Sequence, residues 1–402
     1  MALIFDAILP EARKSAMYAA GFWRHDLISD HFDRAVAAAP DAVAITGRNS
    51  ATGQITTLSW RQLRRRVDRI ALGLAAHGVE RHDVVAVQLP NWWEFVALYL
   101  ACVRIGAVMN PLMPIFRHRE ISFMVGFAQS KVAVVPRSFR GFDYVAMMRD
   151  LRPSLPHLEH VFVVGGGDPD SFEARLVERR WEDAQEPGEL FRRRRPSPDD
   201  VTLLMYTSGT TGEPKGVMHT ANTLLANIHA YLHCIAVSGP QVLLMGSPMA
   251  HLTGFLYGLM PSPVLAAKLV LLDIWNAEVA ARLIHDEGVT FTMGATPFVA
   301  DLADTSAIPG YSVETLKTFV TAGAPIPRVL VERATERLGV FLHSGWGMTE
   351  NGCATITRKG DPPEKVFGTD GAALPGMEVR VVDGDGRPVP PDTEGHLQAR
   401  GA

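Results

Sequence analysis

The stretch that decides the fold is Val201-Thr-Leu-Leu-Met-Tyr206 followed by Thr207-Ser-Gly-Thr-Thr-Gly-Glu-Pro-Lys215. The first run is apolar and β-prone, so it predicts a buried strand. The second run combines small flexible residues, four hydroxyls and a lysine, which together supply the N–H, O–H and ammonium groups that bind an anion. We therefore predict a phosphate-binding loop consisting of Thr207, Ser208, Gly209, Thr210, Thr211, Gly212 and Lys215.

The residues after the loop distinguish it from the common nucleotide-triphosphatase loop. Lys215 is followed by Gly216 instead of Ser or Thr, and Val217-Met-His219 looks extended rather than helical. The expected local order is therefore strand, loop, strand. An ordinary polar hairpin loop is the alternative, but four hydroxyls, flanking glycines and a lysine exceed what a turn requires.

Around this loop, short apolar runs alternate with helical patterns, which predicts an α/β fold with largely parallel sheets. Ser59 and Gln62 form a capping box for a helix within residues 58–78. Asn91 and Glu94 resemble the start signal of another helix. The remaining predictions are strands at 84–89, 132–135 and 161–164, and helices at 92–104, 119–130 and 279–287.

A chain of 402 residues suggests two or three cooperating units, at roughly 150 residues per domain. We expect a first α/β subdomain at 1–195, a second at 196–351 and a partial β-rich, distorted-barrel subdomain at 352–402. The run from Arg192 to Arg195, followed by Pro-Ser-Pro-Asp-Asp, reads as a surface connection. A second hypothesis is that these arginines bind the phosphates of a bulky cosubstrate.

Composition excludes several classes of protein. A net charge of -4 gives no general reason to expect nucleic acid or an anionic membrane as the partner. No apolar run reaches the roughly 18 residues of a membrane span, and the charged N-terminus does not resemble a secretory leader, so we expect a cytoplasmic protein. Three widely spaced cysteines, Cys102, Cys234 and Cys353, predict buried thiols rather than disulfides or a zinc site.

Three motifs of this sequence resemble motifs of a known family and occur in the same order along the chain. Tyr206 to Lys215 looks like the signature loop of the adenylate-forming superfamily of acyl-CoA synthetases, luciferases and peptide-synthetase adenylation domains. Thr321-Ala-Gly-Ala-Pro325 is similar to that family's adenine-binding turn. Gly345-Trp-Gly-Met-Thr-Glu350 is similar to its aromatic-Gly-x-Thr-Glu segment.

The resemblance implies a role for each motif. Trp346 would stack on the adenine face, Thr349 would hold a phosphate oxygen, and Glu350 would supply the oxygen ligand that Mg²⁺ prefers. Lys215, Thr349 and Glu350 are the expected catalytic group. The implied adenine-binding residues are Gly323, Ala324, Pro325, Ser344, Gly345, Trp346 and Gly347. Trp346 stands where the family more often has tyrosine, and Ser344 where glutamine is frequent, which leaves the hydrogen bonds to the adenine edge open.

The acid would occupy an apolar channel. Pro248-Met-Ala-His251-Leu-Thr-Gly-Phe255 resembles the family segment whose histidine lines that channel, and Ala295-Thr-Pro-Phe298 would line it too. The implied acyl-pocket residues are His251, Leu252, Thr253 and Phe298. Residues 89–95 and 109–113 look similar to cyclohexanecarboxylate-CoA ligases, but medium-chain, aromatic and alicyclic acids all stay open, because an apolar channel discriminates weakly.

The expected function is therefore that of an acyl-CoA synthetase, which uses ATP, Mg²⁺ and coenzyme A to convert a carboxylic acid to an acyl-adenylate and then to acyl-CoA. Two alternatives remain: an adenylation domain that loads a carrier protein, and a non-catalytic nucleotide- or acyl-adenylate-binding protein. The resemblance implies that the family's small C-terminal domain, with its catalytic lysine, would lie beyond Ala402, so we expect this chain to be severely impaired in both half-reactions. Whether it forms homo-oligomers is open.

Overall fold

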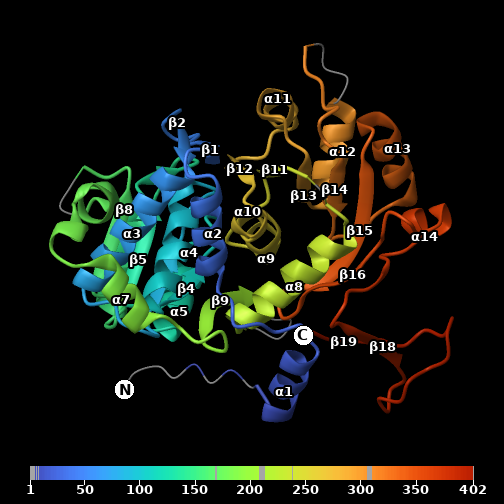
Figure 1. Cartoon of the computed structure of the whole chain (residues 1–402), viewed down its shortest axis with the longest axis horizontal. Coiled ribbons are helices and arrows are strands. Elements are labelled where there is room, and N and C mark those ends of the chain that lie inside the picture. Colours follow the sequence, from blue (N-terminus) through green and yellow to red (C-terminus); the bar gives the residue numbers. More distant parts are fainter. Residues whose placement is uncertain are drawn as a thin grey trace. The chain divides into compact units, whose positions relative to one another are not determined.

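The computed structural model describes residues 5, 7, 9–167, 170–207, 213–237, 239–305 and 310–401. Within them the chain is a mixed α/β protein with largely parallel sheets, as the sequence predicted, and it forms two compact units (Figure 1). The first unit comprises Met1–Ile8, His25–Ala221 and Val242–Asn276, and the second comprises Leu9–Arg24, Asn222–Gln241 and Ala277–Ala402. The division of the chain at 195 and 351 stays a prediction.

A six-stranded sheet forms the core of the first unit. Its strand order is β10-β9-β4-β3-β5-β8, and every neighbouring pair is parallel except β10 with β9. The predicted strands at 84–89, 132–135 and 161–164 are confirmed as β3, β5 and β8. The bounds are β3 Val84–Val87, β4 Val108–Pro111, β5 Val132–Pro136, β8 His160–Val164, β9 Val201–Thr207 and β10 Lys215–Thr220.

The same unit contains four further sheet strands and a short hairpin. β11 pairs in parallel with β12, β12 pairs in parallel with β1, and β1 pairs antiparallel with β2. β6 and β7 form the hairpin. The bounds are β1 Val43–Arg48, β2 Ile55–Ser59, β6 Ser138–Phe139, β7 Phe142–Asp143, β11 Val242–Met245 and β12 Lys268–Leu272.

Helices cover these sheets, and their starts test the predicted signals. The capping box is confirmed, because Ser59 Oγ accepts from the Gln62 amide at 3.3 Å and Gln62 Oε1 accepts from the Ser59 amide at 2.9 Å. The helices of the first unit are α2 Ile28–Ala38, α3 Trp60–Ala76, α4 Trp93–Ile105, α5 His118–Phe127, α6 Tyr144–Leu151, α7 Pro187–Arg194, α9 Leu252–Gly254 and α10 Pro261–Leu265.

Two local predictions were wrong. Asn91 does not cap α4, whose N-cap is Trp92 without a side-chain hydrogen bond, because the Asn91 amide bonds to other segments of the unit. The arginine run is not a loop, because α7 extends to Arg194 and Pro187 at its first position favours a helix start. The Arg195 guanidinium donates two hydrogen bonds to the Asp30 carboxylate, at 2.6 and 2.7 Å. It therefore already has an ion-pair partner within the protein.

The second unit has its own strands. β13, β14 and β15 pair in parallel, and β15-β16-β17 continue antiparallel. β18 and β19 form a separate hairpin where the sequence predicted two strands, and the described residues contain no closed barrel. The bounds are β13 Phe291–Gly294, β14 Thr318–Thr321, β15 Phe341–Met348, β16 Gly352–Ile356, β17 Ala372–Ala373, β18 Glu378–Val382 and β19 His396–Arg400.

The helices of the second unit include α11, which confirms the prediction at 279–287. They are α1 Glu11–Ala19, α8 Ala221–Cys234, α11 Ala277–Glu287, α12 Thr296–Thr305, α13 Arg328–Leu338 and α14 Pro363–Gly368. The three cysteines are buried, as predicted, and burial raises the pKa of Cys102 to about 12. Across the described parts of the chain, no helix is both long and apolar enough to span a bilayer.

Candidate functional site

The predicted phosphate loop joins two antiparallel strands. Lys215 lies opposite Thr207, and Gly216 lies opposite Tyr206, so β9 and β10 bring the two ends of the loop side by side. The predicted order of strand, loop and strand is confirmed. The loop's tip, Ser208, Gly209, Thr210, Thr211 and Gly212, lies outside the described residues.

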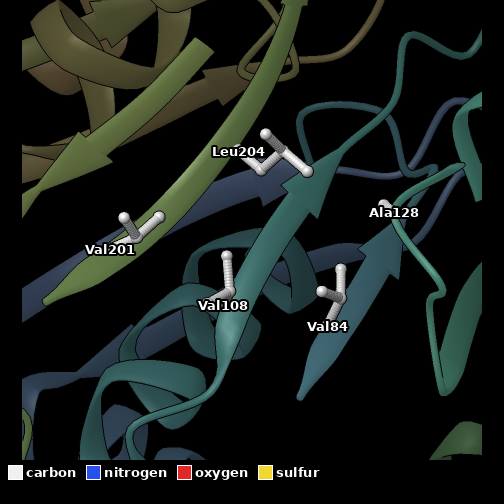
Figure 2. Packing of buried hydrophobic residues seen from close by; sticks show 5 residues of the cluster. All are labelled: Val84, Val108, Ala128, Val201 and Leu204. Carbon is white, nitrogen blue, oxygen red and sulfur yellow. The ribbon is translucent and has the colours of Figure 1, made fainter. Parts of the chain in front are cut away.

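The base of this hairpin is fixed by apolar packing. Val201 and Leu204 of β9 meet Val84 of β3 and Val108 of β4, with Ala128 completing the cluster (Figure 2). Burial of each such side chain contributes about 1.5–3 kcal/mol, so β9 has little freedom to shift. Nearer the loop, the Tyr206 hydroxyl donates to the Met124 carbonyl at 3.1 Å. A rigid strand therefore leads directly into the loop.

Lys215 is the cation at the far end of the loop. Its side chain is exposed, and among the described residues it makes no ion pair or hydrogen bond. An ammonium group without an internal partner can accept a ligand anion without breaking an existing contact. Thr207, across the hairpin, is half-buried. The hairpin thus offers a positive charge beside the hydroxyl-rich loop.

In the second unit, the predicted adenine-binding turn follows β14. Gly323 has a φ of +87°, a left-handed conformation that favours glycine, and Ala324 and Pro325 are exposed. Just before the turn, Thr321 is fully buried and its Oγ1 has no hydrogen-bond partner. The sequence motif includes Thr321, but the sequence alone assigns no role to its hydroxyl.

The second adenine segment runs along β15, next to that turn. Thr321 of β14 and Ser344 of β15 are register partners, so the two motifs are neighbours within the unit. Ser344 is buried, and its amide donates to Thr357 Oγ1 at 2.9 Å. Trp346 is half-buried. Gly347 is needed for close approach, because a Cβ there would lie 2.1 Å from the Gly352 carbonyl oxygen.

The predicted metal ligand lies just beyond β15. Glu350 is exposed, and among the described residues its carboxylate has no hydrogen-bond or ion-pair partner. Thr349, beside it, is half-buried. The described residues contain no group of three or more metal-ligating side chains. One carboxylate fits Mg²⁺, which usually completes its shell with waters and substrate phosphates.

One residue missed by the sequence reasoning holds this turn in place. Asn227 of α8 donates from Nδ2 to the carbonyls of Asn351 and Cys353, at 3.0 and 2.9 Å. Its Oδ1 also accepts from the Cys353 amide at 3.3 Å. Nothing in the local sequence around Asn227 indicates these contacts, because 124 residues separate it from Asn351.

The predicted acyl-pocket histidine starts a short helix in the first unit. His251 is the N-cap of α9, and its Nδ1 accepts from the Thr253 amide at 3.2 Å. Although the residue is exposed, partial desolvation of the ring lowers its pKa, which favours the neutral imidazole. Leu252 is buried and Thr253 is half-buried.

The other predicted acyl-pocket segment lies in the second unit. Phe298 is half-buried in the first turn of α12. Thr296, two residues earlier, donates from Oγ1 to the Pro325 carbonyl at 3.3 Å. This contact joins the start of α12 to the adenine turn. The predicted residues are therefore distributed over both units, with the phosphate hairpin and His251 on the first and the adenine segments, Glu350 and Phe298 on the second.

Comparison with known proteins gives one family. Residues 32–402 match the family described as AMP-binding enzyme. The chain is 31% identical to a medium-chain fatty-acid–CoA ligase of Escherichia coli over 97% of its own length and 67% of the relative's. It is 30% identical to a salicyl-AMP ligase/salicyl-S-ArCP synthetase of Mycobacterium tuberculosis over 98% of its length and 68% of the relative's. The chain thus spans about two thirds of these relatives.

Solved structures share the fold. The apo structure of MbtA from Mycobacterium smegmatis superposes with a TM-score of 0.82 at 29% identity, covering 98% of this chain and 70% of that one. The anthranilate CoA ligase AuaEII, in complex with anthranoyl-AMP, superposes with a TM-score of 0.80 at 21% identity, covering 95% and 71%. The second likeness concerns the fold alone.

Proposed function

This chain belongs to the AMP-binding enzyme family of ATP-dependent, AMP-forming ligases, and we propose that it activates a medium-chain, aromatic or alicyclic carboxylic acid for transfer to coenzyme A. The observation that carries the proposal is the β9–β10 hairpin, which brings Lys215 opposite Thr207 at the base of the phosphate loop. A cation and a hydroxyl-rich loop at the end of a rigid strand suit a bound polyphosphate.

In the proposed first half-reaction, the acid's carboxylate oxygen attacks the α-phosphorus of ATP. The P–O bond to the β-phosphate breaks, and pyrophosphate leaves with the electron pair. The protein forms no covalent bond, so its task is positioning and charge neutralisation. The phosphate loop and Lys215 hold the leaving phosphates. Gly323, Ala324, Pro325 and the strand from Ser344 to Gly347 hold the adenine, with Trp346 stacking on it.

Glu350 is the proposed ligand of Mg²⁺, and Thr349 is the proposed partner of a phosphate oxygen. The ion, when bound, neutralises charge that develops on the phosphate oxygens. The exposed and unpaired carboxylate of Glu350 supports this assignment. In the second half-reaction, the coenzyme A thiolate attacks the acyl carbonyl, forms the C–S bond and displaces AMP.

The nature of the acid is proposed from the acyl-pocket residues. The proposed acyl-pocket residues are Leu252 and Phe298, which are apolar, Thr253, and His251, for which a lowered pKa favours the neutral form, so the acyl channel is proposed to be mostly apolar. The similarity to a medium-chain fatty-acid–CoA ligase supports an aliphatic acid. Alicyclic acids remain part of the proposal because such a channel discriminates by only about 1–3 kcal/mol per methylene.

A panel of acids tests the proposal. Exchange of labelled pyrophosphate into ATP is measured with octanoate, cyclohexanecarboxylate and salicylate, each against a no-acid control. Because this chain is expected to be impaired in the first half-reaction, we expect exchange that is slow, depends on acid and Mg²⁺ and is strongest with octanoate or cyclohexanecarboxylate. Acid-independent ATP hydrolysis to ADP would contradict the proposal. Nucleotide binding with no exchange for any acid and no preference for an acyl-adenylate analogue over AMP would favour a non-catalytic nucleotide-binding protein.

A second candidate function is loading of a carrier protein, which the similarity to a salicyl-AMP ligase/salicyl-S-ArCP synthetase favours. The adenylation step would be the same, and only the thiol acceptor would differ. Mass spectrometry of the thioester, with coenzyme A and a pantetheinylated aryl carrier protein as competing acceptors, separates the two. Salicylate exchange with acylation of the carrier alone would select this candidate.

A further inference from the structure

Asn91 lies in the loop between β3 and α4, and its side chain is almost fully buried at 3% exposure. It donates from Nδ2 to the carbonyls of Met245, Ser247 and Leu272, at 3.3, 2.8 and 3.2 Å. Its Oδ1 accepts from the Met249 amide at 2.7 Å. One amide group therefore uses both its donors and its acceptor on backbone that lies more than 150 residues away along the chain.

The segment that Asn91 holds leads directly to His251. Ser247 and Met249 are bonded to Asn91, and the His251 amide then donates to the Pro248 carbonyl at 3.0 Å. The Phe255 amide in turn donates to the His251 carbonyl at 3.0 Å. The backbone from residue 247 to 255 is thus a continuous bonded path from Asn91 to the histidine.

Close packing restricts the same segment from its other end. A Cβ at Gly254 would lie 2.3 Å from the Pro248 carbonyl oxygen and 2.5 Å from that of Ser247. The start of α9 therefore lies directly against the residues that Asn91 holds. A shift of this segment would disturb both the Asn91 hydrogen bonds and this contact, because protein interiors are close-packed.

We propose that Asn91 is a positioning residue for the acyl pocket: it fixes the backbone of residues 247–249 and thereby sets where His251 and Leu252 meet the acyl group. This inference rests on the proposed function, because it takes residues 251–253 as part of the acyl pocket. Among the described residues, the hydrogen bonds of the Asn91 side chain all go to backbone groups of residues 245–249 and 272, so its proposed role is to position that backbone. Its loss would therefore change recognition of the acyl group and leave recognition of AMP unaffected.

The neighbouring residue gives a matched control. Trp92 Nε1 donates to Asp273 Oδ2 at 2.7 Å, and Asp273 also accepts from the Ser50 amide at 2.8 Å. Trp92→Phe removes one partly buried hydrogen bond next to Asn91 and leaves the Asn91 hydrogen bonds to residues 247 and 249 in place. Like Asn91→Ala, it should lower the free energy of unfolding by about 1–3 kcal/mol. It therefore separates a general loss of stability from a specific effect on the His251 segment.

Binding measured by calorimetry uses two probes: AMP, and 5′-O-(N-octanoylsulfamoyl)adenosine, in which a sulfamate replaces the phosphate of octanoyl-adenylate. We expect Asn91→Ala to weaken binding of the octanoyl analogue about tenfold, the scale of a misfit in an apolar pocket, while AMP affinity changes less than twofold. Trp92→Phe should leave the ratio of the two affinities unchanged. Gly254→Ala, which disturbs the segment from its other side, should lower that ratio as Asn91→Ala does.

Hydrogen exchange monitors the segment directly, independently of any ligand. Peptides covering 246–255 should exchange faster in Asn91→Ala than in the wild type, while those covering β3 should not. Equal loss of affinity for both probes, or an unchanged ratio in Asn91→Ala and Gly254→Ala, would overturn the positioning role. A wild-type protein that binds AMP as tightly as the octanoyl analogue would instead contradict the proposed function, so the two failures are distinguishable.

Discussion

Asn227 and Cys353 are joined by two hydrogen bonds: Asn227 Nδ2 donates to the Cys353 carbonyl at 2.9 Å, and Asn227 Oδ1 accepts from the Cys353 amide at 3.3 Å. This pairing mimics a step of a β-ladder and attaches α8 to the start of β16. The turn that precedes β16 carries Thr349 and Glu350. The position of the proposed magnesium ligand therefore depends on a helix side chain more than 120 residues away.

Asn227→Ala should weaken magnesium-dependent binding of ATP. The substitution removes the hydrogen bonds from Asn227 to the backbone of Asn351 and Cys353, at about 1–3 kcal/mol, and loosens the turn that holds Glu350. We expect the gain in ATP affinity on adding Mg²⁺ to fall about tenfold, which corresponds to roughly 1.4 kcal/mol. Calorimetric titration of ATP with and without Mg²⁺ measures this gain.

The matched control for this variant is on the same helix. Asn222 is also buried, but it donates to the Tyr18 hydroxyl and accepts from the Arg24 amide. Asn222→Ala should lower stability and leave the gain in ATP affinity on adding Mg²⁺ as in the wild type. An equal loss in both variants would show that Asn227 supports only the fold of the unit.

Lys215→Ala should weaken nucleotide binding in proportion to the number of phosphates beyond the α-phosphate. The lysine lies at the end of the phosphate loop and is proposed to hold the β- and γ-phosphates, so we expect a loss of about tenfold or more for ATP and little change for AMP. The exposed Lys365 of α14 offers a control substitution of the same type. Equal weakening of ATP and AMP by Lys215→Ala would reject this assignment.

Glu94 should make the protein less stable as pH rises. Burial raises the pKa of Glu94 to about 8 from an ordinary value of 4.5, and among the described residues its Oε2 has no hydrogen-bond partner. The folded state therefore keeps a proton that the unfolded state loses above pH 4.5. The resulting loss of stability grows between about pH 4.5 and 8 and reaches roughly 3 kcal/mol at pH 7.

Glu94→Gln removes this penalty, because glutamine stays neutral at every pH. We expect the variant to be more stable than the wild type at pH 7, and the difference in unfolding free energy to vanish near pH 4.5. Chemical denaturation of both proteins at several pH values measures it. A difference that does not vary with pH would mean that Glu94 is not protonated in the folded protein.

The sequence predicted what local chemistry controls. The capping box of Ser59 and Gln62, the apolar strands and the strand-loop-strand order at Lys215 all depend on residues close together in the chain, and the structure confirms them. The error at Asn91 has the opposite cause. An asparagine before a helix is a good N-cap by its local pattern, but here distant carbonyls compete for its amide.

The same reason explains what was missed at the site. Asn227 acquires its role only through hydrogen bonds to a segment far away in sequence, and the burial of the Thr321 hydroxyl likewise depends on how β14 packs in the folded unit. The arginine run predicts a surface connection because four successive charged residues lack apolar periodicity. Pro187 at the start of α7 is the sequence signal that indicates the helix, and the structure shows that Leu190 is its buried residue.

Calorimetric titration of the wild-type protein with AMP and with the octanoylsulfamoyl analogue tests the central claim most directly. A protein built to form an acyl-adenylate binds an analogue of that intermediate far more tightly than either of its halves. The account predicts one site per chain and an affinity for the analogue at least about a hundredfold above that for AMP. Equal affinities for the octanoyl, cyclohexanecarbonyl and salicyl analogues and for AMP itself would contradict it.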